Sequence, residues 1–267
     1  MLDLLKRIGS AVGLTQVPPG AKPPVFQVPA ILPALSAKNG AELAKAGGFA
    51  SGVPGPADPA AQSSSQFLAT ALNERQEVAP ATRAIARTLP EQKRLEWAVA
   101  SCERVEDHMA PADRDAFAAA RAYLTKPGPA EGRLAGEAAA KSGYRGPGAF
   151  AAKAVSLSSE ARTGTATAEA PAAAPPTGTD PVGDCVAGAV SLAALLECGK
   201  LPSAESLAAG ERQAAAAAAA AATPATSAGA SACAAVAAAL PPTAEEITEV
   251  SHAMKPYIED GLVRAAG

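Results

Sequence analysis

Histidines and their acidic neighbours are the residues best suited to acid–base or metal chemistry, and the chain has two, His108 and His252. His108 lies beside Asp107 and close to Asp113, at the expected end of one helix and start of the next. A metal ion there would need a third or fourth ligand from elsewhere in the chain. We interpret this group as a solvated helix terminus, where a histidine is favoured near the negative end of the helix dipole. For His252, a surface pair with Glu249 is favoured over a general base.

Cysteine thiols are the next candidates, as nucleophiles, disulfide partners or metal ligands. The four cysteines are Cys102, Cys185, Cys198 and Cys233. They have neither the density of a disulfide framework nor the paired spacing of a metal knuckle. Cys102 falls on an apolar helical stripe, and Cys185 and Cys233 have alanine-rich surroundings. We therefore expect buried, inert thiols in a reducing compartment.

Motifs with a known catalytic mechanism are absent from the sequence. There is no GKS or GKT, no GxSxG, no HExxH, and no GxGxxG on a strand-to-helix turn. The carboxylates of Glu106 and Asp107, and those of Glu245 and Glu246, are adjacent in sequence and do not converge on one point of a helix. We assign no catalytic residue, no cofactor-binding residue and no metal ligand. The sequence thus predicts a protein that is not an enzyme and needs no cofactor.

Charge and hydropathy narrow the classes of partner. The formal net charge is −3 with mixed signs, so no basic stripe is available for a phosphate backbone and nucleic acid is not expected as a partner. The alanine run 214–222 falls short of the roughly 20 residues of a membrane-spanning helix. Near the N-terminus, Lys6 and Arg7 precede an apolar stretch that Gly9 and Gly13 interrupt, unlike a signal peptide. We expect a cytoplasmic protein with no transmembrane segment.

The first 62 residues are expected to form a short helix followed by a linker. Residues 1–14 place apolar side chains on one face of a short amphipathic helix. This helix would act as a docking peptide, anchor the chain on a membrane surface, or pack on its own domain or fray. Residues 15–62 are rich in proline and glycine, which predicts an unstructured linker with at most one helical turn at 41–46.

Helical periodicity begins after this stretch, and residues 63–160 are expected to form the first part of a helical core. The predicted helices start near residue 65 and then cover residues 79–89, 91–109, 111–124, 130–142 and 148–157. In the helix over 91–109, apolar residues recur three and four positions apart. Trp97, the single tryptophan, is expected to anchor the core from this helix.

A second low-complexity linker is predicted over residues 161–179, followed by the second part of the helical core over 180–267. Asp180 and Pro181 mark a helix start, because aspartate caps a helix N-terminus and proline suits the first position. High alanine propensity predicts a helix over 205–222. A final helix should begin at Thr243 and be kinked at Pro256. The expected fold is all-α, an alanine-rich antiparallel helical bundle or a stack of helix pairs with disordered linkers.

Three segments, in this order, resemble a bacterial helical family known as domain of unknown function 6931. They are QFLATAL with AIARTLPEQKRLEWAVASC (66–102), AYLTKP (122–127) followed by DPVGDCVAGAVSLAALL (180–196), and YIEDGLVRAAG (257–267). The resemblance covers residues 65–267 apart from the linkers. Members of that family are often encoded near type VI secretion genes. The resemblance therefore implies an accessory or effector-related role, and it carries over no catalytic residue.

These observations favour a cytoplasmic, non-enzymatic helical module that binds protein partners, with components of type VI secretion suggested by the resemblance. Two alternatives remain open. A secreted effector or toxin-associated protein would cause growth arrest when expressed in a neighbouring cell type. A peripheral membrane protein held by residues 1–14 would sediment with anionic vesicles.

Overall fold

The computed structural model describes residues 22–49, 58–163, 180–199 and 244–267, and regular structure in these residues is helical. The α-helices are α2 (Gly40–Gly47), α3 (Ser64–Ala69), α4 (Val78–Thr88), α5 (Glu91–Glu103), α6 (Pro111–Thr125), α7 (Pro129–Ser142), α8 (Pro147–Thr163), α9 (Pro181–Glu197) and α12 (Ala244–Ala266). Shorter turns are the 3-10 helices η1 (Pro59–Ala61) and η3 (Glu106–His108) and the π-helix η2 (Thr70–Glu74). The predicted all-α class is confirmed.

Helix α9 lies at the centre of the fold. Its side chains are apolar on nearly every side, which is typical of a helix buried all round. Helices α4, α5, α8 and α12 pack against it. The helix begins as the sequence predicts, since the Asp180 side chain accepts a hydrogen bond from the Gly183 N–H at 3.0 Å and Pro181 occupies the first turn.

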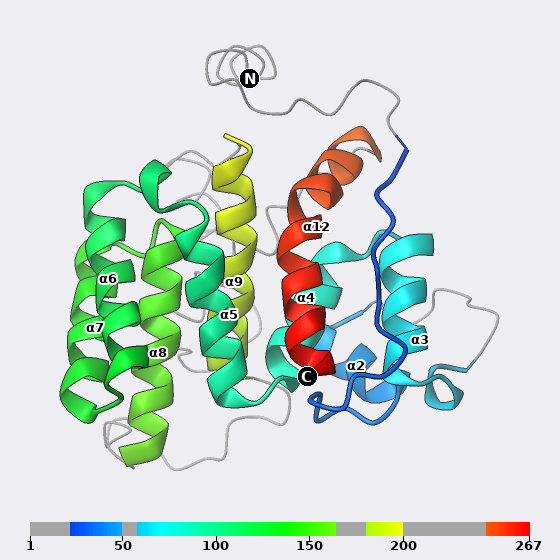
Figure 1. The fold of residues 1–267 in the computed structure, drawn as a ribbon, viewed down its shortest axis with the longest axis horizontal. Helices are drawn as coiled ribbons and strands as arrows, with labels where there is room; N and C mark the ends of the chain where they lie inside the picture. The colour runs from blue at the N-terminus through cyan, green and yellow to red at the C-terminus, as the bar shows by residue number, and fades with distance from the viewer. Residues whose placement is uncertain (1–21, 50–57, 164–179, 200–243) are drawn as a thin grey trace, which may run out of the picture.

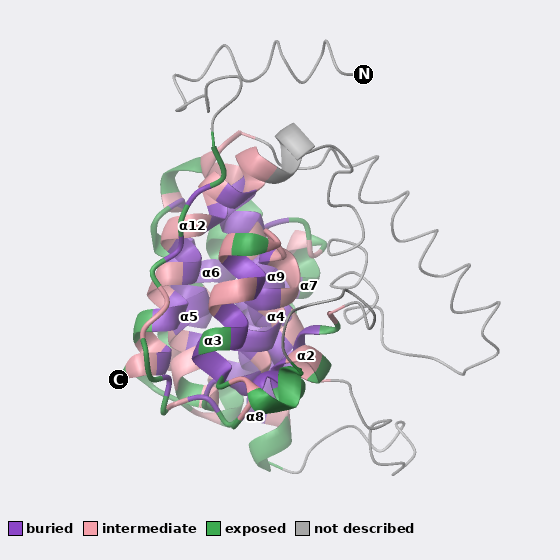
Figure 2. Ribbon diagram, turned by 90° about the vertical axis from the view of Figure 1, so that its right-hand side faces the viewer, coloured by how far each residue is buried: buried purple, intermediate pink, exposed green. Residues whose placement is uncertain are grey.

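The remaining helices form two groups on either side of α5 and α9 (Figure 1). Helices α6, α7 and α8 pack against one another in the first group, and α2, α3, α4 and α12 form the second. Buried residues of both groups belong to a single hydrophobic cluster. Figure 2 shows these buried residues concentrated where α4, α5 and α9 lie. The stretches 63–160 and 180–267, expected as two parts, therefore share one core over the described residues.

Glycines allow α7 to approach α8 closely. A Cβ atom on Gly136 would lie 2.6 Å from Ser156 Oγ, and a Cβ on Gly132 would overlap the side chain of Ser159. Gly132 and Gly136 are one helical turn apart on α7, and both face serines on α8. Small residues on both helices thus allow the two backbones to pack closely at this contact.

Substituting Gly132→Ala is expected to destabilise the protein by about 1–3 kcal/mol, because the added methyl overpacks the α7–α8 contact. An unhindered helical site would show the opposite sign, since alanine is the better helix former. Urea unfolding followed by circular dichroism measures the change. The double variant Gly132→Ala with Ser159→Gly should recover most of the loss. Equal losses in the single and double variants would contradict the contact.

The linker predicted over residues 15–62 is wrong for the part that the structure describes. Residues 22–37 run as an elongated segment along α12, and α2 follows them (Figure 1). Buried apolar residues in this part are Phe26, Leu32, Leu35, Ala37 and Leu43. A segment outside any helix or sheet has few ladder hydrogen bonds to lose, so its prolines are tolerated. The proline-rich segment 22–37 is therefore part of the core.

The helix predicted over residues 91–109 is shorter in the structure. Helix α5 stops at Glu103, and the 3-10 helix η3 follows. Glu103 and the acidic residues of η3 lie near the negative end of the helix dipole, which disfavours further helix. Val105 and Met109 are nevertheless buried. The tighter turn therefore keeps the apolar stripe in the core. Trp97 is fully buried, which confirms its predicted place.

The amphipathic helix expected over 1–14, the alanine-rich helix over 205–222 and Cys233 lie outside the described residues. Of the linker expected over 161–179, residues 161–163 belong to the last turn of α8, and the rest lies outside the described residues. Helix α12 continues through Pro256, where a kink was expected. Within the described ranges, none of the helices is both long and apolar enough to cross a membrane.

Candidate functional site

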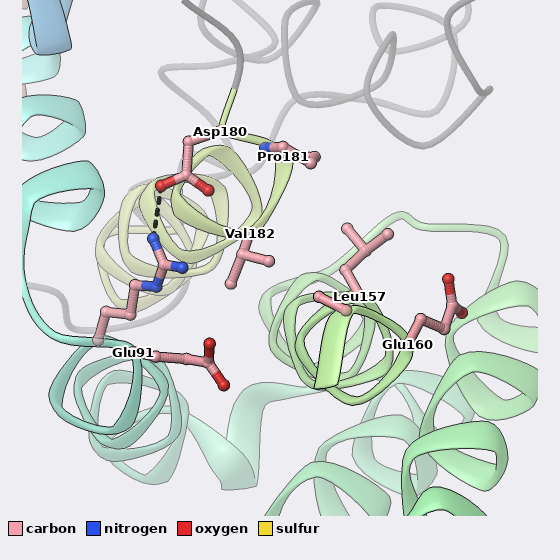
Figure 3. Close-up of a pocket in the computed structure, with 8 residues that line it drawn as sticks. Glu91, Leu157, Glu160, Asp180, Pro181 and Val182 are labelled. Carbon is pink, nitrogen blue, oxygen red and sulfur yellow. Dashed lines mark hydrogen bonds and ion pairs between the residues drawn. The ribbon is translucent and has the colours of Figure 1, made fainter. Parts of the chain in front are cut away.

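A surface pocket opens where α5 begins, α8 ends and α9 begins (Figure 3). It is lined by Glu91, Arg94, Leu157, Glu160, Ala161, Asp180, Pro181 and Val182. Its volume of about 390 Å³ lies within the range of roughly 300–1,000 Å³ that is common for ligand sites. Helices α5, α8 and α9 supply the lining, and the pocket is open to solvent.

An ion pair closes the side of the pocket between α5 and α9. Arg94 Nη1 lies 2.5 Å from Asp180 Oδ2, and the two side chains are 13% and 29% exposed. Asp180 also caps α9 through its other oxygen. Asp180 is therefore neutralised by a partner 86 residues away, whereas Arg94 Nε is buried without a hydrogen-bond partner.

The other two carboxylates of the pocket have serines as their partners. Ser158 Oγ donates to Glu91 Oε1 at 2.6 Å, and Ser156 Oγ donates to Glu160 Oε1 at 2.9 Å. Hydroxyl donors carry no charge, so the lining residues comprise three carboxylates and a single guanidinium, an excess of negative charge. Figure 3 shows Glu91 pointing toward the space between α5, α8 and α9, whereas the Glu160 carboxylate lies on the far side of Leu157 and points away from Glu91 and Asp180.

Apolar side chains form the rest of the lining. Leu157, Ala161, Pro181 and Val182 come from the end of α8 and the start of α9. Lysine and arginine bury their methylene stems along apolar surface and hold the charged head near polar groups. Hydrogen bonds from such a head to a carboxylate are stronger than those between neutral groups. The pocket thus has the chemistry to receive a basic side chain.

The group Asp107, His108 and Asp113 is not gathered into a metal site. Asp107 and His108 are exposed on η3, as expected for a solvated terminus. Asp113 is buried, contrary to that interpretation, and its carboxylate accepts hydrogen bonds from the N–H groups of Ala149 at 2.7 Å and Gly148 at 3.3 Å. Asp113 therefore satisfies the first turn of α8 from a neighbouring helix. The described residues hold no group of three or more potential metal ligands.

Burial raises the pKa of the Asp113 carboxyl above its ordinary value of 3.8, and its two backbone hydrogen bonds oppose this less strongly. The folded chain then holds this proton more tightly than the unfolded chain. The contribution to stability is therefore complete below the unfolded pKa and is lost as the pH rises through the folded pKa. Relative to Asp113→Asn, the wild-type free energy of unfolding should fall over this interval. Urea titrations of both proteins at a series of pH values measure the free energy of unfolding. A wild-type stability that rises with pH relative to Asp113→Asn would contradict the expectation.

The cysteines and His252, the remaining candidates for chemistry, lie in surroundings typical of structural residues. Cys102 and Cys185 are buried, as predicted, and Cys198 is half-buried. Burial raises the pKa of the Cys102 thiol well above its usual range, with Asp113 and Glu103 adding to the effect, so this thiol is a poor nucleophile. The His252 Nε2 atom lies 3.0 Å from the carbonyl oxygen of Lys22, a contact that local spacing could not reveal.

Comparison with known proteins identifies one relationship. The model of a family of unknown function, DUF6931, matches residues 67–209, which is more than half of the chain. Nearly all of the segment 66–102 and all of the segment 180–196 lie within the match, whereas YIEDGLVRAAG lies outside it. No curated protein and no solved structure matches the chain.

Proposed function

The chain belongs to the DUF6931 family of unknown function, and from this we propose that it is a non-enzymatic helical module that binds a protein partner through the pocket between α5, α8 and α9. The pocket lies within the matched residues, 67–209. One observation carries the proposal: the lining combines an excess of carboxylates with an apolar wall. A protein segment that inserts a lysine or arginine would satisfy both features.

The binding strength should depend on Glu91 and Glu160. Arg94 already pairs with Asp180, and no hydrogen bond from the described residues reaches the second oxygen of either glutamate. A basic side chain would therefore gain an acceptor at Glu91 without displacing an existing ion pair, and Glu160 would add negative charge at the edge of the pocket. Because the pocket is open to solvent, added salt should weaken the interaction.

The finer role that we propose is an accessory or adaptor of type VI secretion, acting in the cytoplasm. Its support is the gene neighbourhood that the family resemblance implies. The partner in this case is a secretion component that presents a basic side chain. The carboxylates of the pocket add a chemical requirement that such a component must meet.

The experiment compares the partners of three tagged full-length proteins recovered from the native cell. They are the wild type, the double variant Glu91→Gln with Glu160→Gln, and the control Glu137→Gln. Glutamine keeps an acceptor for each serine, so the double variant should remain folded. Glu137 is an exposed glutamate on α7, paired with Arg133, and does not line the pocket.

We expect a partner recovered with the wild type and the control to be reduced at least tenfold with the double variant. Quantitative mass spectrometry measures the ratio, and circular dichroism checks the fold. Unchanged recovery by the double variant would reject the pocket as the binding site. Recovery of no partner by the wild type would reject the module itself.

A further inference from the structure

Large exposed apolar side chains gather on one surface of the molecule. Among the described residues, those more than half exposed are Val25 at 70%, Ile31 at 72%, Leu134 at 53% and Val263 at 65%. All but Leu134 belong to the segment 22–37 and to α12, which lie side by side (Figure 1). Single exposed apolar side chains are ordinary, whereas a group of them marks a contact surface. We call Val25, Ile31 and Val263 the apolar patch.

The register of the segment 22–37 on α12 places Ile31 at the level of Val263. The N–H group four residues before Ile31 donates to Glu259 Oε1 at 3.1 Å, and the N–H group three residues after it donates to the Ala265 carbonyl oxygen at 3.0 Å. Val263 lies between these two contacts on α12. It follows Glu259 by one helical turn, so it shares the face of α12 that contacts the segment.

The outer face of the segment carries no charge. Residues 23–33 contain no aspartate, glutamate, lysine, arginine or histidine. The exposed residues in this stretch are Pro23, Val25, Gln27, Ala30, Ile31 and Pro33. Charged residues are the ones that most often occupy exposed positions. The segment therefore presents the composition of a contact surface around the patch.

Residues 1–14 are the segment of this chain that fits the patch. Apolar residues recur in it three and four positions apart, at Leu2, Leu5, Ile8 and Val12. A helix of this length would extend about 21 Å. The extended chain from Val25 to Ile31 spans about 20 Å. One helix laid along the segment would thus cover the whole patch.

The connection to the described chain favours this placement. The Lys22 carbonyl oxygen lies 3.0 Å from His252 Nε2, at the end of the segment nearer Val25. Residues 15–21 reach up to about 25 Å when extended, and the dipeptide Pro19-Gly20 is typical of a turn. The chain can therefore reverse and run back over the patch. A tether this short gives an effective concentration in the millimolar range, which favours the chain's own patch over that of a second molecule.

We propose that residues 1–14 form an amphipathic helix that packs on the apolar patch of their own chain. A helix this short is marginal alone in water, so the patch supplies the contact that stabilises it. Once docked, its apolar face is covered and unavailable to a membrane. Residues 1–14, the segment 22–37 and α12 lie outside the family match, and none of them lines the pocket between α5, α8 and α9. The contact is thus independent of the proposed function.

Hydrogen–deuterium exchange of the full-length chain tests the contact. The amides of residues 2–12 should be protected at least tenfold relative to a synthetic peptide of residues 1–14. The double variant Ile31→Gln with Val263→Gln removes the apolar contact and should lower this protection to that of the peptide. The control Leu134→Gln changes an exposed apolar residue on α7 and should keep the protection of the wild type. An unchanged protection of the Trp97 amide in α5 shows that each variant is folded.

Several outcomes would overturn the proposal. Residues 2–12 that exchange in the wild type as fast as in the peptide would show that no docked helix exists. Protection that survives in the folded double variant would place the helix elsewhere. Protection that falls tenfold when the protein is diluted tenfold would assign the patch to a second copy. Protection that appears only with vesicles of phosphatidylserine and phosphatidylcholine would make residues 1–14 a membrane anchor instead.

Discussion

Replacing Trp97 with alanine is expected to lower the free energy of unfolding by about 3–5 kcal/mol, the usual cost of removing a large buried aromatic side chain. The ring is fully buried, and its Nε1–H donates to the Tyr257 carbonyl oxygen at 2.9 Å. A Cβ on Gly261 would lie 2.6 Å from the indole, so α12 packs directly on the ring. The substitution should therefore both open a cavity and loosen α12.

Urea unfolding followed by circular dichroism measures this loss, because removing the single tryptophan also removes its fluorescence. Limited proteolysis should cut α12 sooner in the variant than in the wild type. Trp97→Phe serves as the control: it keeps much of the apolar volume but loses the N–H donor, so its loss should be smaller. If Trp97→Ala unfolded at the wild-type midpoint with α12 equally protected, the packing of α12 on α5 would be wrong.

Replacing Arg87 with alanine should cost about 2–3 kcal/mol, because it leaves a partly buried carboxylate short of its main partner. Arg87 Nε and Nη2 reach the two oxygens of Asp184 at 2.9 and 2.8 Å, and the side chains are 16% and 24% exposed. Arg87 Nη1 donates to the Ala46 carbonyl oxygen at 2.9 Å, near the end of α2. One guanidinium therefore joins α4, α9 and α2.

Urea unfolding also measures this second effect, with two comparison variants. Arg87→Lys should recover only part of the loss, since an ammonium cannot make the paired hydrogen bonds of a guanidinium. Arg133→Ala removes an exposed i,i+4 pair with Glu137 and should change stability by no more than about 0.5 kcal/mol. Similar effects of Arg87→Ala and Arg133→Ala would show that the ion pair to Asp184 contributes little.

Local sequence signals were sufficient to predict the positions of most of the helices. Asp180 with Pro181 gave the start of α9, and Leu89 with Pro90 separated α4 from α5. Periodicity placed Trp97 in the core. These signals act within one or two helical turns, so a single sequence is enough to reveal them.

The buried segment 22–37 and the pocket were missed because their contacts join residues far apart in sequence. Phe26 is held by Asn73, 47 positions later, and a proline-rich segment with such partners has the composition of a linker. The partner of Asp180, Arg94, is 86 positions away, so only the capping role of Asp180 could be predicted. The sequence likewise places Asp113 in the first turn of its own helix, and it gives no sign that the carboxylate caps α8.

A charge-reversal exchange tests most directly whether the pocket between α5, α8 and α9 binds a basic side chain. Isothermal titration calorimetry would compare the wild type and Glu91→Lys, each against the purified partner and against a partner variant whose basic residue is replaced by glutamate. We expect Glu91→Lys to weaken binding of the natural partner at least tenfold, about 1.4 kcal/mol, and to bind the reversed partner better than the wild type does. Equal affinities of the wild type and Glu91→Lys for the natural partner would contradict the proposed site.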